Sequence, residues 1–77
     1  PQVLVNVRVR DKNGWEQHPD IKKAIDDAAA KLGDNGQILV RASGTEPLIR
    51  IMAEGPNQIE LENMAGAIAD VVSKSLA

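Results

Sequence analysis

Valine occupies every second position from Val3 to Val9, and this alternation constrains the fold more than any other feature of the sequence. Successive side chains of a β-strand point to opposite faces of the sheet, so the pattern predicts a strand from Val3 to Arg10 with one buried face. The opposite face of this strand is mostly polar and carries Leu4, Asn6, Arg8 and Arg10.

The hydrophobic spacing then changes to that of a helix. Two loop signals, Asn13-Gly14 and His18-Pro19, precede apolar residues at helical intervals, namely Ile21, Ala24, Ile25, Ala28 and Leu32. Either the fixed φ of Pro19 or a capping carboxylate from Asp20 begins this helix, and Gly33 ends it.

The second part of the chain predicts two strands and another helix. Residues 34–36 form a turn, and strands are expected at Gln37 to Arg41 and Leu48 to Glu54. Asn57 and Glu60 have the spacing of a capping box, and one apolar helical stripe follows them, formed by Leu61, Met64, Ala65, Ile68 and Val72. The order β-α-β-β-α predicts a single α+β domain over residues 1–77, with two helices on one face of a small, mainly antiparallel sheet. A short fourth element would fit near Lys12 to Trp15 or at the terminus.

Length and composition exclude several classes of function. A chain of 77 residues holds one small domain and is too short for a self-contained enzyme. The net charge of -2 and the single aromatic residue, Trp15, argue against nucleic-acid binding, and no apolar run is long enough to span a membrane. The absence of cysteine favours a reducing, cytoplasmic setting, and the first residue, Pro1, suggests a fragment cut from a longer polypeptide.

The chemistry-bearing stretch is Arg41-Ala42-Ser43-Gly44-Thr45-Glu46-Pro47, a loop longer than a tight hairpin requires. Ser43 and Thr45 offer hydroxyl donors, and Gly44 permits a positive φ that would turn backbone amides inward. Arg41 and Arg50 add forked cationic donors from the flanking strands. These groups together are the parts of a phosphate cradle. Alternatively, the small residues are ordinary turn residues, and the two arginines pair with Glu46 or Glu54.

The same loop resembles the phosphate-binding loop in the C-terminal domain of the α-D-phosphohexomutases. Gly44 after Ser43 and the continuation Leu48-Ile49-Arg50-Ile51-Met52-Ala53-Glu54 are most similar to the bacterial phosphoglucosamine mutases within that superfamily. The strands at Val3 to Val9 and Gly36 to Val40 also resemble those of these enzymes, whereas residues 11–18 have no firm match.

This resemblance implies a TBP-like C-terminal domain excised from a larger, multidomain isomerase. The parent enzyme would interconvert glucosamine 6-phosphate and glucosamine 1-phosphate through a bisphosphorylated sugar, for cell-wall precursor synthesis. Its phosphoserine and Mg²⁺ would lie in other domains, so this domain would hold no metal and no catalytic residue and would be inactive alone. The resemblance assigns substrate phosphate contacts to Arg41, Ser43, Gly44 and Thr45. It also assigns a supporting role to Arg50. From its position in the strand, three residues beyond Pro47, the Arg50 guanidinium could reach back to the phosphate or brace the loop through Glu46.

Three alternatives remain open from the sequence. The same domain could belong to a phosphoglucomutase or phosphomannomutase. A small regulatory domain could share the element order, and a protein-interaction module could use Trp15 and an open sheet face carrying Leu4, Leu39 and Leu48. Trp15 would either cap the core or touch another domain, and His18, the only histidine, is expected to be a loop residue rather than a catalytic one.

Overall fold

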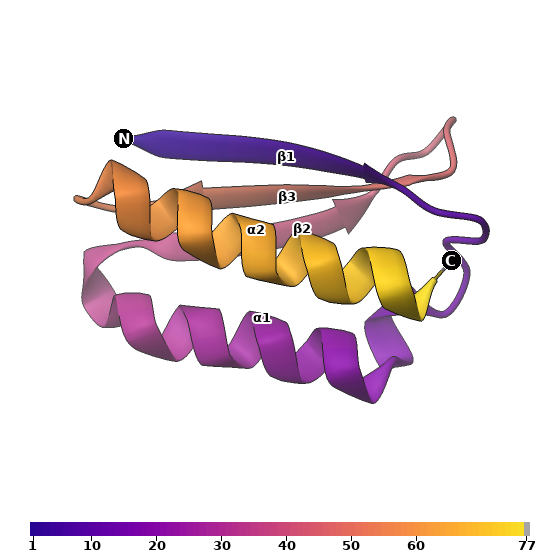
Figure 1. Ribbon diagram of the computed structural model, residues 1–77, viewed down its shortest axis with the longest axis horizontal. Coiled ribbons are helices and arrows are strands. Elements are labelled where there is room, and N and C mark those ends of the chain that lie inside the picture. Colours follow the sequence, from indigo (N-terminus) through magenta and orange to yellow (C-terminus); the bar gives the residue numbers. More distant parts are fainter. Residues whose placement is uncertain (77) are drawn as a thin grey trace.

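Three strands and two long helices follow one another in the expected order β-α-β-β-α in the computed structural model, which describes residues 1–76. The elements are β1 (Gln2–Arg8), α1 (Pro19–Leu32), β2 (Gln37–Ala42), β3 (Leu48–Glu54) and α2 (Gln58–Ser75) (Figure 1). Two short 3₁₀ turns, η1 (Trp15–Gln17) and η2 (Gly33–Asn35), flank α1. The element η1 lies close to the place where the sequence left room for a further short element.

The last strand in the chain, β3, forms the centre of the sheet. The spatial order is β1-β3-β2, and both neighbours pair with β3 in antiparallel fashion. The register places Leu4 opposite Met52 and Leu39 opposite the same methionine from the other side. The expected antiparallel α+β architecture is therefore confirmed.

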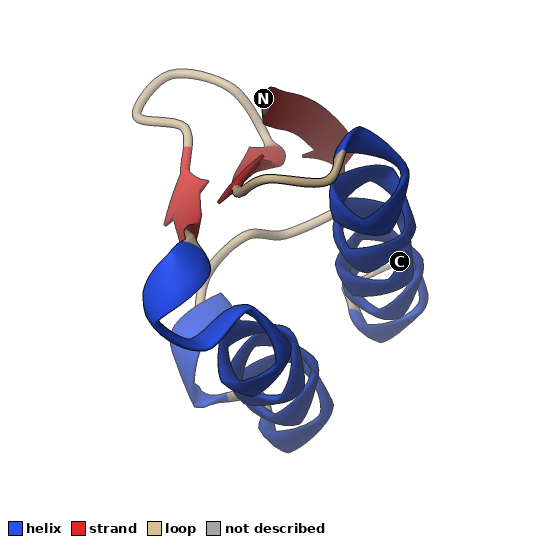
Figure 2. Ribbon diagram, turned by 90° about the vertical axis from the view of Figure 1, so that its left-hand side faces the viewer, coloured by secondary structure: helices blue, strands red, loops and turns tan. Residues whose placement is uncertain are grey.

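Both helices cover one face of this sheet and leave the other face open, as predicted (Figure 2). The largest fully buried side chains come from the helices and from β3, namely Ile21, Ile49, Ile51, Leu61, Ile68 and Val72. Trp15 is half-buried and packs against this core, so of its two expected roles the structure supports the first. None of the helices in residues 1–76 is long and apolar enough to cross a membrane.

The helix ends follow the sequence signals with one correction. Pro19 is the first residue of α1 and Gly33 ends it with a φ of 55°, as expected. Of the two expected helix starts, the structure has Pro19. The capping side chain is that of His18 and not Asp20, because Nδ1 of His18 accepts a hydrogen bond from the Asp20 amide at 3.3 Å. His18 lies one residue before the proline, where a side-chain acceptor can reach the first exposed amides of the helix. The side chain of Asn57 caps α2 by accepting from the Glu60 amide at 3.0 Å.

Gly36 marks the closest approach of two backbone segments. A Cβ atom built at this position would lie 2.0 Å from the carbonyl oxygen of Glu54, in the strand that pairs with β2. A backbone carbonyl in a paired strand cannot move aside as a flexible side chain can. The entry of the chain into β2 therefore requires glycine.

We predict that Gly36→Ala lowers the free energy of unfolding by about 1–3 kcal/mol or more, because the methyl group overpacks a site that cannot yield. Gly66→Ala is the matched control, since a Cβ at Gly66 in the exposed part of α2 meets no atom within 4 Å. This control should raise stability by about 0.5–1 kcal/mol through helix propensity. Urea denaturation of both variants checks the pair, and equal stabilities would contradict the close approach.

Candidate functional site

The two arginines singled out from the sequence lie directly opposite each other on the open face of the sheet. The register pairs Arg41 of β2 with Arg50 of β3, and Asn6 of β1 flanks Arg50 on its other side. All three residues are exposed. Like charges directly opposite each other in an antiparallel pair repel and destabilise the sheet. The row therefore concentrates positive charge that does not help the sheet to fold.

Neither arginine forms an ion pair within residues 1–76. Glu46 in the loop pairs instead with Arg8, with 3.0 Å between the guanidinium nitrogen and the carboxylate oxygen. Glu54 accepts hydrogen bonds from Gln2 and Gln37, which lie opposite it at the far end of the sheet. The expectation that Arg50 braces the loop through Glu46 was therefore wrong in this structure, as was the alternative that Glu46 or Glu54 neutralises the arginines.

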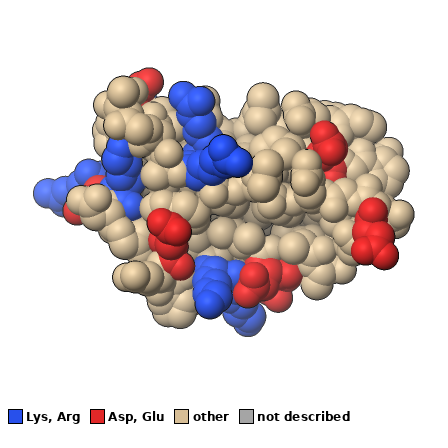
Figure 3. Space-filling model, turned by 180° about the vertical axis from the view of Figure 1, so that it is seen from behind, with Lys and Arg blue, Asp and Glu red and all other residues tan. Residues whose placement is uncertain are grey.

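The positive side chains gather toward one end of the molecule. Seen from behind, Lys and Arg side chains lie mainly over the half that contains the loop between β2 and β3 (Figure 3). Arg41 and Arg50 lie near this half, because β2 ends and β3 begins there. Asp and Glu side chains also lie in this half (Figure 3), so its uncompensated positive charge comes from Arg41 and Arg50, which have no carboxylate partner within residues 1–76.

Ser43 organises the loop that joins these strands. Its backbone amide donates to the Leu48 carbonyl at 3.0 Å, extending the ladder by one step. Its hydroxyl oxygen accepts from the amides of Thr45 at 3.4 Å and Glu46 at 3.2 Å, and the residue is only 7% exposed. The Ser43 hydroxyl thus closes the turn, a role that serine commonly plays in loops.

Gly44 does not adopt the positive φ expected from the sequence. Positive φ values occur only at Gly14 and Gly33 within the described chain. A Cβ atom at Gly44 would also meet nothing within 4 Å. Neither backbone conformation nor packing within residues 1–76 explains a glycine here, and its lack of a side chain leaves the surface above the loop open.

Lys12 contacts this loop, which the sequence analysis did not predict. Its ammonium group donates to the carbonyl oxygens of Ser43 and of Glu46, the latter at 3.3 Å. The lysine lies in the irregular segment between β1 and η1, which has no periodicity and no motif. Only its position next to the first strand's end could have indicated a contact with the loop.

The open face differs from expectation at Leu48. This residue shares the face of Arg50, as strand parity requires, but it is only 6% exposed, whereas Leu4 is 72% exposed. Leu48 begins the central strand at the base of the loop, with Arg8 beside it in β1. The exposed apolar residues of this face are therefore Leu4 and Leu39, without Leu48.

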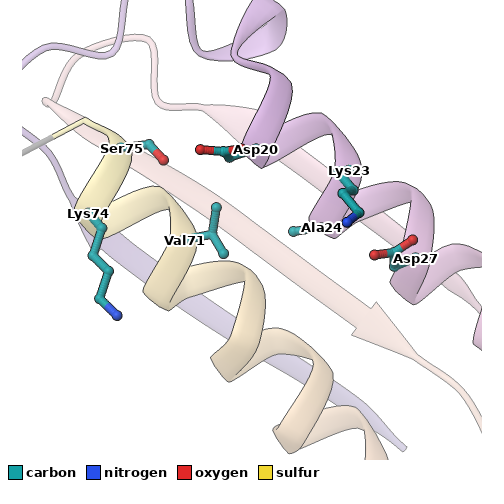
Figure 4. Close-up of a pocket in the computed structure, with 7 residues that line it drawn as sticks. All are labelled: Asp20, Lys23, Ala24, Asp27, Val71, Lys74 and Ser75. Atoms are coloured by element: carbon teal, nitrogen blue, oxygen red, sulfur yellow. The ribbon is translucent and has the colours of Figure 1, made fainter.

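A groove of about 370 Å³ between α1 and α2 is the principal alternative binding site. Asp20 and Ser75 point toward one another across it, and Lys74 points away (Figure 4). The ammonium group of Lys74 pairs with Asp70 at 3.0 Å. With Asp20, Asp27 and Lys23 also in its lining, the groove has mixed charge and no concentration of anion donors.

The described residues do not fit a metal site. No three His, Asp or Glu side chains of residues 1–76 come together as a possible ligand set. The hydrogen-bond donors that Arg41, Arg50 and the loop present at this end are guanidinium groups, hydroxyls and a backbone amide.

Comparison with known proteins now assigns the family. Residues 4–71 match the model of the phosphoglucomutase/phosphomannomutase C-terminal domain. The chain belongs to this family. Phosphoglucosamine mutase from Symbiobacterium thermophilum is 50% identical over 76 residues, and the same enzyme from Heliobacterium modesticaldum is 56% identical over 71 residues. These matches cover 99% and 92% of the chain, but only 17% and 15% of the relatives' own lengths.

Solved structures share the phosphohexomutase C-terminal fold. A variant of Aspergillus fumigatus N-acetylphosphoglucosamine mutase in complex with glucose 1,6-bisphosphate matches with a TM-score of 0.85 and 27% identity, over 100% of this chain and 16% of that chain. Another structure of the fungal enzyme, in complex with GlcNAc-6P and magnesium, matches with a TM-score of 0.79 and 26% identity, over the same shares. The resemblance recognised from the loop and strands is thereby confirmed.

The opposed arginines give a test of the site that needs no ligand. We expect Arg41→Gln to raise the free energy of unfolding by about 0.2–1 kcal/mol at low ionic strength, because it removes the repulsion from Arg50. The gain should shrink as added salt screens the charges.

Arg8→Gln is the control for this measurement, because it removes the same charge from an arginine that has a carboxylate partner. The free energy of unfolding of Arg8→Gln should equal that of the original chain or be slightly lower. Denaturation at two salt concentrations separates the variants, and a salt-independent loss of stability in Arg41→Gln would contradict the unpaired cationic row.

Proposed function

We propose that this chain is the C-terminal phosphate-binding domain of a larger, multidomain phosphoglucosamine mutase. The parent enzyme interconverts glucosamine 6-phosphate and glucosamine 1-phosphate through a bisphosphorylated intermediate. Curated relatives at 50% and 56% identity carry that name, whereas the family model covers phosphoglucomutases and phosphomannomutases in general. The relatives therefore favour the glucosamine phosphates over glucose or mannose phosphates as the substrate.

One observation carries the proposal: two exposed arginines lie side by side with no carboxylate partner in the described chain, at the base of a loop with an open surface. Guanidinium groups bind phosphate oxygens through paired, charge-assisted hydrogen bonds. A doubly negative phosphate above Arg41 and Arg50 would convert their mutual repulsion into attraction to a shared partner. The loop of Ser43, Gly44 and Thr45 adds neutral donors at the same end.

In the proposed mechanism this domain holds the phosphate that is not being transferred. Binding energy from a non-reacting group orients the sugar and offsets the cost of aligning it for reaction elsewhere in the enzyme. The phosphoserine and the magnesium ion would belong to other domains, which is in keeping with the magnesium named in the complex of the fungal neighbour. The isolated domain would then bind phosphate without catalysing turnover.

We expect the 77-residue chain to bind glucosamine 6-phosphate or inorganic phosphate with a Kd near about 1 mM, since a few donors hold one exposed anion. In an NMR titration the largest amide shifts should fall on Ser43, Gly44 and Thr45. Arg41→Ala should abolish the shifts without unfolding the chain, and Arg50→Ala should weaken binding less. Equal losses would assign both arginines directly to the phosphate. Shifts that cluster at the groove between α1 and α2 would refute the site.

A substitution at Gly44 provides a second test of the phosphate site. Because a Cβ atom there meets nothing within 4 Å, the substitution should change phosphate binding without changing stability. Gly44→Ala should leave the free energy of unfolding within about 0.5 kcal/mol of the original, as for other exposed positions. It should weaken phosphate binding by roughly tenfold, about 1.4 kcal/mol, because the added methyl group crowds the approach to the loop amides.

Gly66→Ala is the control for Gly44→Ala, since it is the same substitution at another position where a Cβ meets nothing within 4 Å. Its affinity for phosphate should equal that of the original chain. Unchanged phosphate affinity in Gly44→Ala would show that the ligand does not approach this side of the loop.

A further inference from the structure

Lys12 holds the phosphate loop from a segment outside the family's loop motif. It reaches across from the connection between β1 and η1, and its ammonium group donates to the carbonyl oxygens of Ser43 and Glu46. These two carbonyls lie on either side of the Gly44-Thr45 turn. One side chain thereby fixes both arms of the loop.

Peptide geometry turns this contact into a constraint on the amide that follows. In a trans peptide the C=O and the N–H point in opposite directions, and no peptide bond in the described chain is cis. Because Lys12 holds the carbonyl of Ser43 toward itself, the N–H of Gly44 must point away from the lysine. The next two amides, of Thr45 and Glu46, already donate to the Ser43 hydroxyl.

The Gly44 N–H is consequently the backbone amide of this loop that remains available. It donates to no acceptor within residues 1–76, and a Cβ atom built at this position would meet no atom within 4 Å beyond the two neighbouring residues. An amide fixed in direction, unpartnered and uncovered is prepared for an incoming acceptor. The same peptide without Lys12 would rotate, because its carbonyl would have only solvent to bind.

The charge of Lys12 is also left uncompensated. Its donors go to neutral carbonyls, while the only carboxylate in the loop, that of Glu46, pairs with Arg8. A lysine has three donors and no acceptor, so the contact orders the loop without cancelling its positive potential. The half-buried ammonium group thus adds to the field of Arg41 and Arg50 at this end of the molecule.

We propose that Lys12 is a positioning residue for phosphate binding, which holds the Ser43–Gly44 peptide so that the Gly44 N–H faces the ligand. The proposal rests on the function proposed above, in which the loop binds phosphate. It extends the site to a lysine that forms no part of the run from Arg41 to Pro47.

The test is an NMR titration of the 77-residue chain with inorganic phosphate, applied to the original sequence, Lys12→Met, Lys12→Arg and Lys22→Met. Lys22 lies exposed on α1, so Lys22→Met removes the same charge away from the loop. Lys12→Met should raise the phosphate Kd by about five- to tenfold, the effect of losing one fixed hydrogen-bond donor in the site. Lys22→Met should change it less than about twofold, since exposed distant charges are screened.

The ligand-free spectrum gives the readout that distinguishes positioning from general stability. The Gly44 amide resonance should move in Lys12→Met, stay in place in Lys22→Met, and return toward its original position in Lys12→Arg, whose guanidinium can also donate to two carbonyls. Thermal unfolding of each variant establishes that the chain is folded. If Lys12→Met does not fold, the phosphate affinity and the Gly44 resonance of Lys12→Arg still test the proposal.

Each outcome decides the matter. Unchanged phosphate affinity in Lys12→Met overturns the role of Lys12 and leaves the proposed function standing. Weaker binding with an unmoved Gly44 resonance also overturns it, because the lysine would then act through its charge alone. If the original chain shows no phosphate-induced shifts at residues 43–45, both the positioning role and the proposed function fail.

Discussion

The central strand β3 determines where everything else in this domain lies. It pairs along its length with β1 on one side and β2 on the other. Ile49, Ile51 and Ala53 on one of its faces are completely buried under the helices. A shift of one residue in its register would turn these side chains to solvent and drive Arg50 into an apolar core, where an unpaired charge is very costly. The packing of the core therefore also fixes the arginine row.

The order of the elements and the place of the two arginines on the open face were predictable because both depend on local patterns. Alternating valines, helical spacing and the residues at helix ends predicted the order of the elements, and parity placed Arg41 and Arg50 on the open face. The contacts of Lys12 and Arg8 with the loop were not predictable, since they join residues more than 30 positions apart. The irregular segment that carries Lys12 has no period from which its path could be inferred. The capping role of His18 was missed because Asp20 offered a more usual capping side chain.

The loop separates residues that the fold requires from residues that it does not. Ser43 is needed to close the turn, because its hydroxyl accepts two amides that would otherwise lack a partner in the described chain. Gly44 satisfies no such internal requirement, and the adjacent arginines repel one another. A fold selected only for stability would have a residue with a side chain in place of Gly44. It would also have opposite charges in place of the two like charges of Arg41 and Arg50. We attribute these residues to the phosphate that we propose the loop binds.

A site built from arginine forks and backbone amides recognises a phosphate but reads nothing of the sugar that carries it. The guanidinium groups of Arg41 and Arg50 and the Gly44 amide are all hydrogen-bond donors. None of them would distinguish an amino substituent on the sugar from a hydroxyl. In the proposed mutase this indifference is useful, because a bisphosphorylated intermediate that turns over presents first one phosphate and then the other to the same cradle. The choice of glucosamine over other hexoses must then be made by residues beyond this loop, and the domain contributes binding energy common to all the sugars of its family.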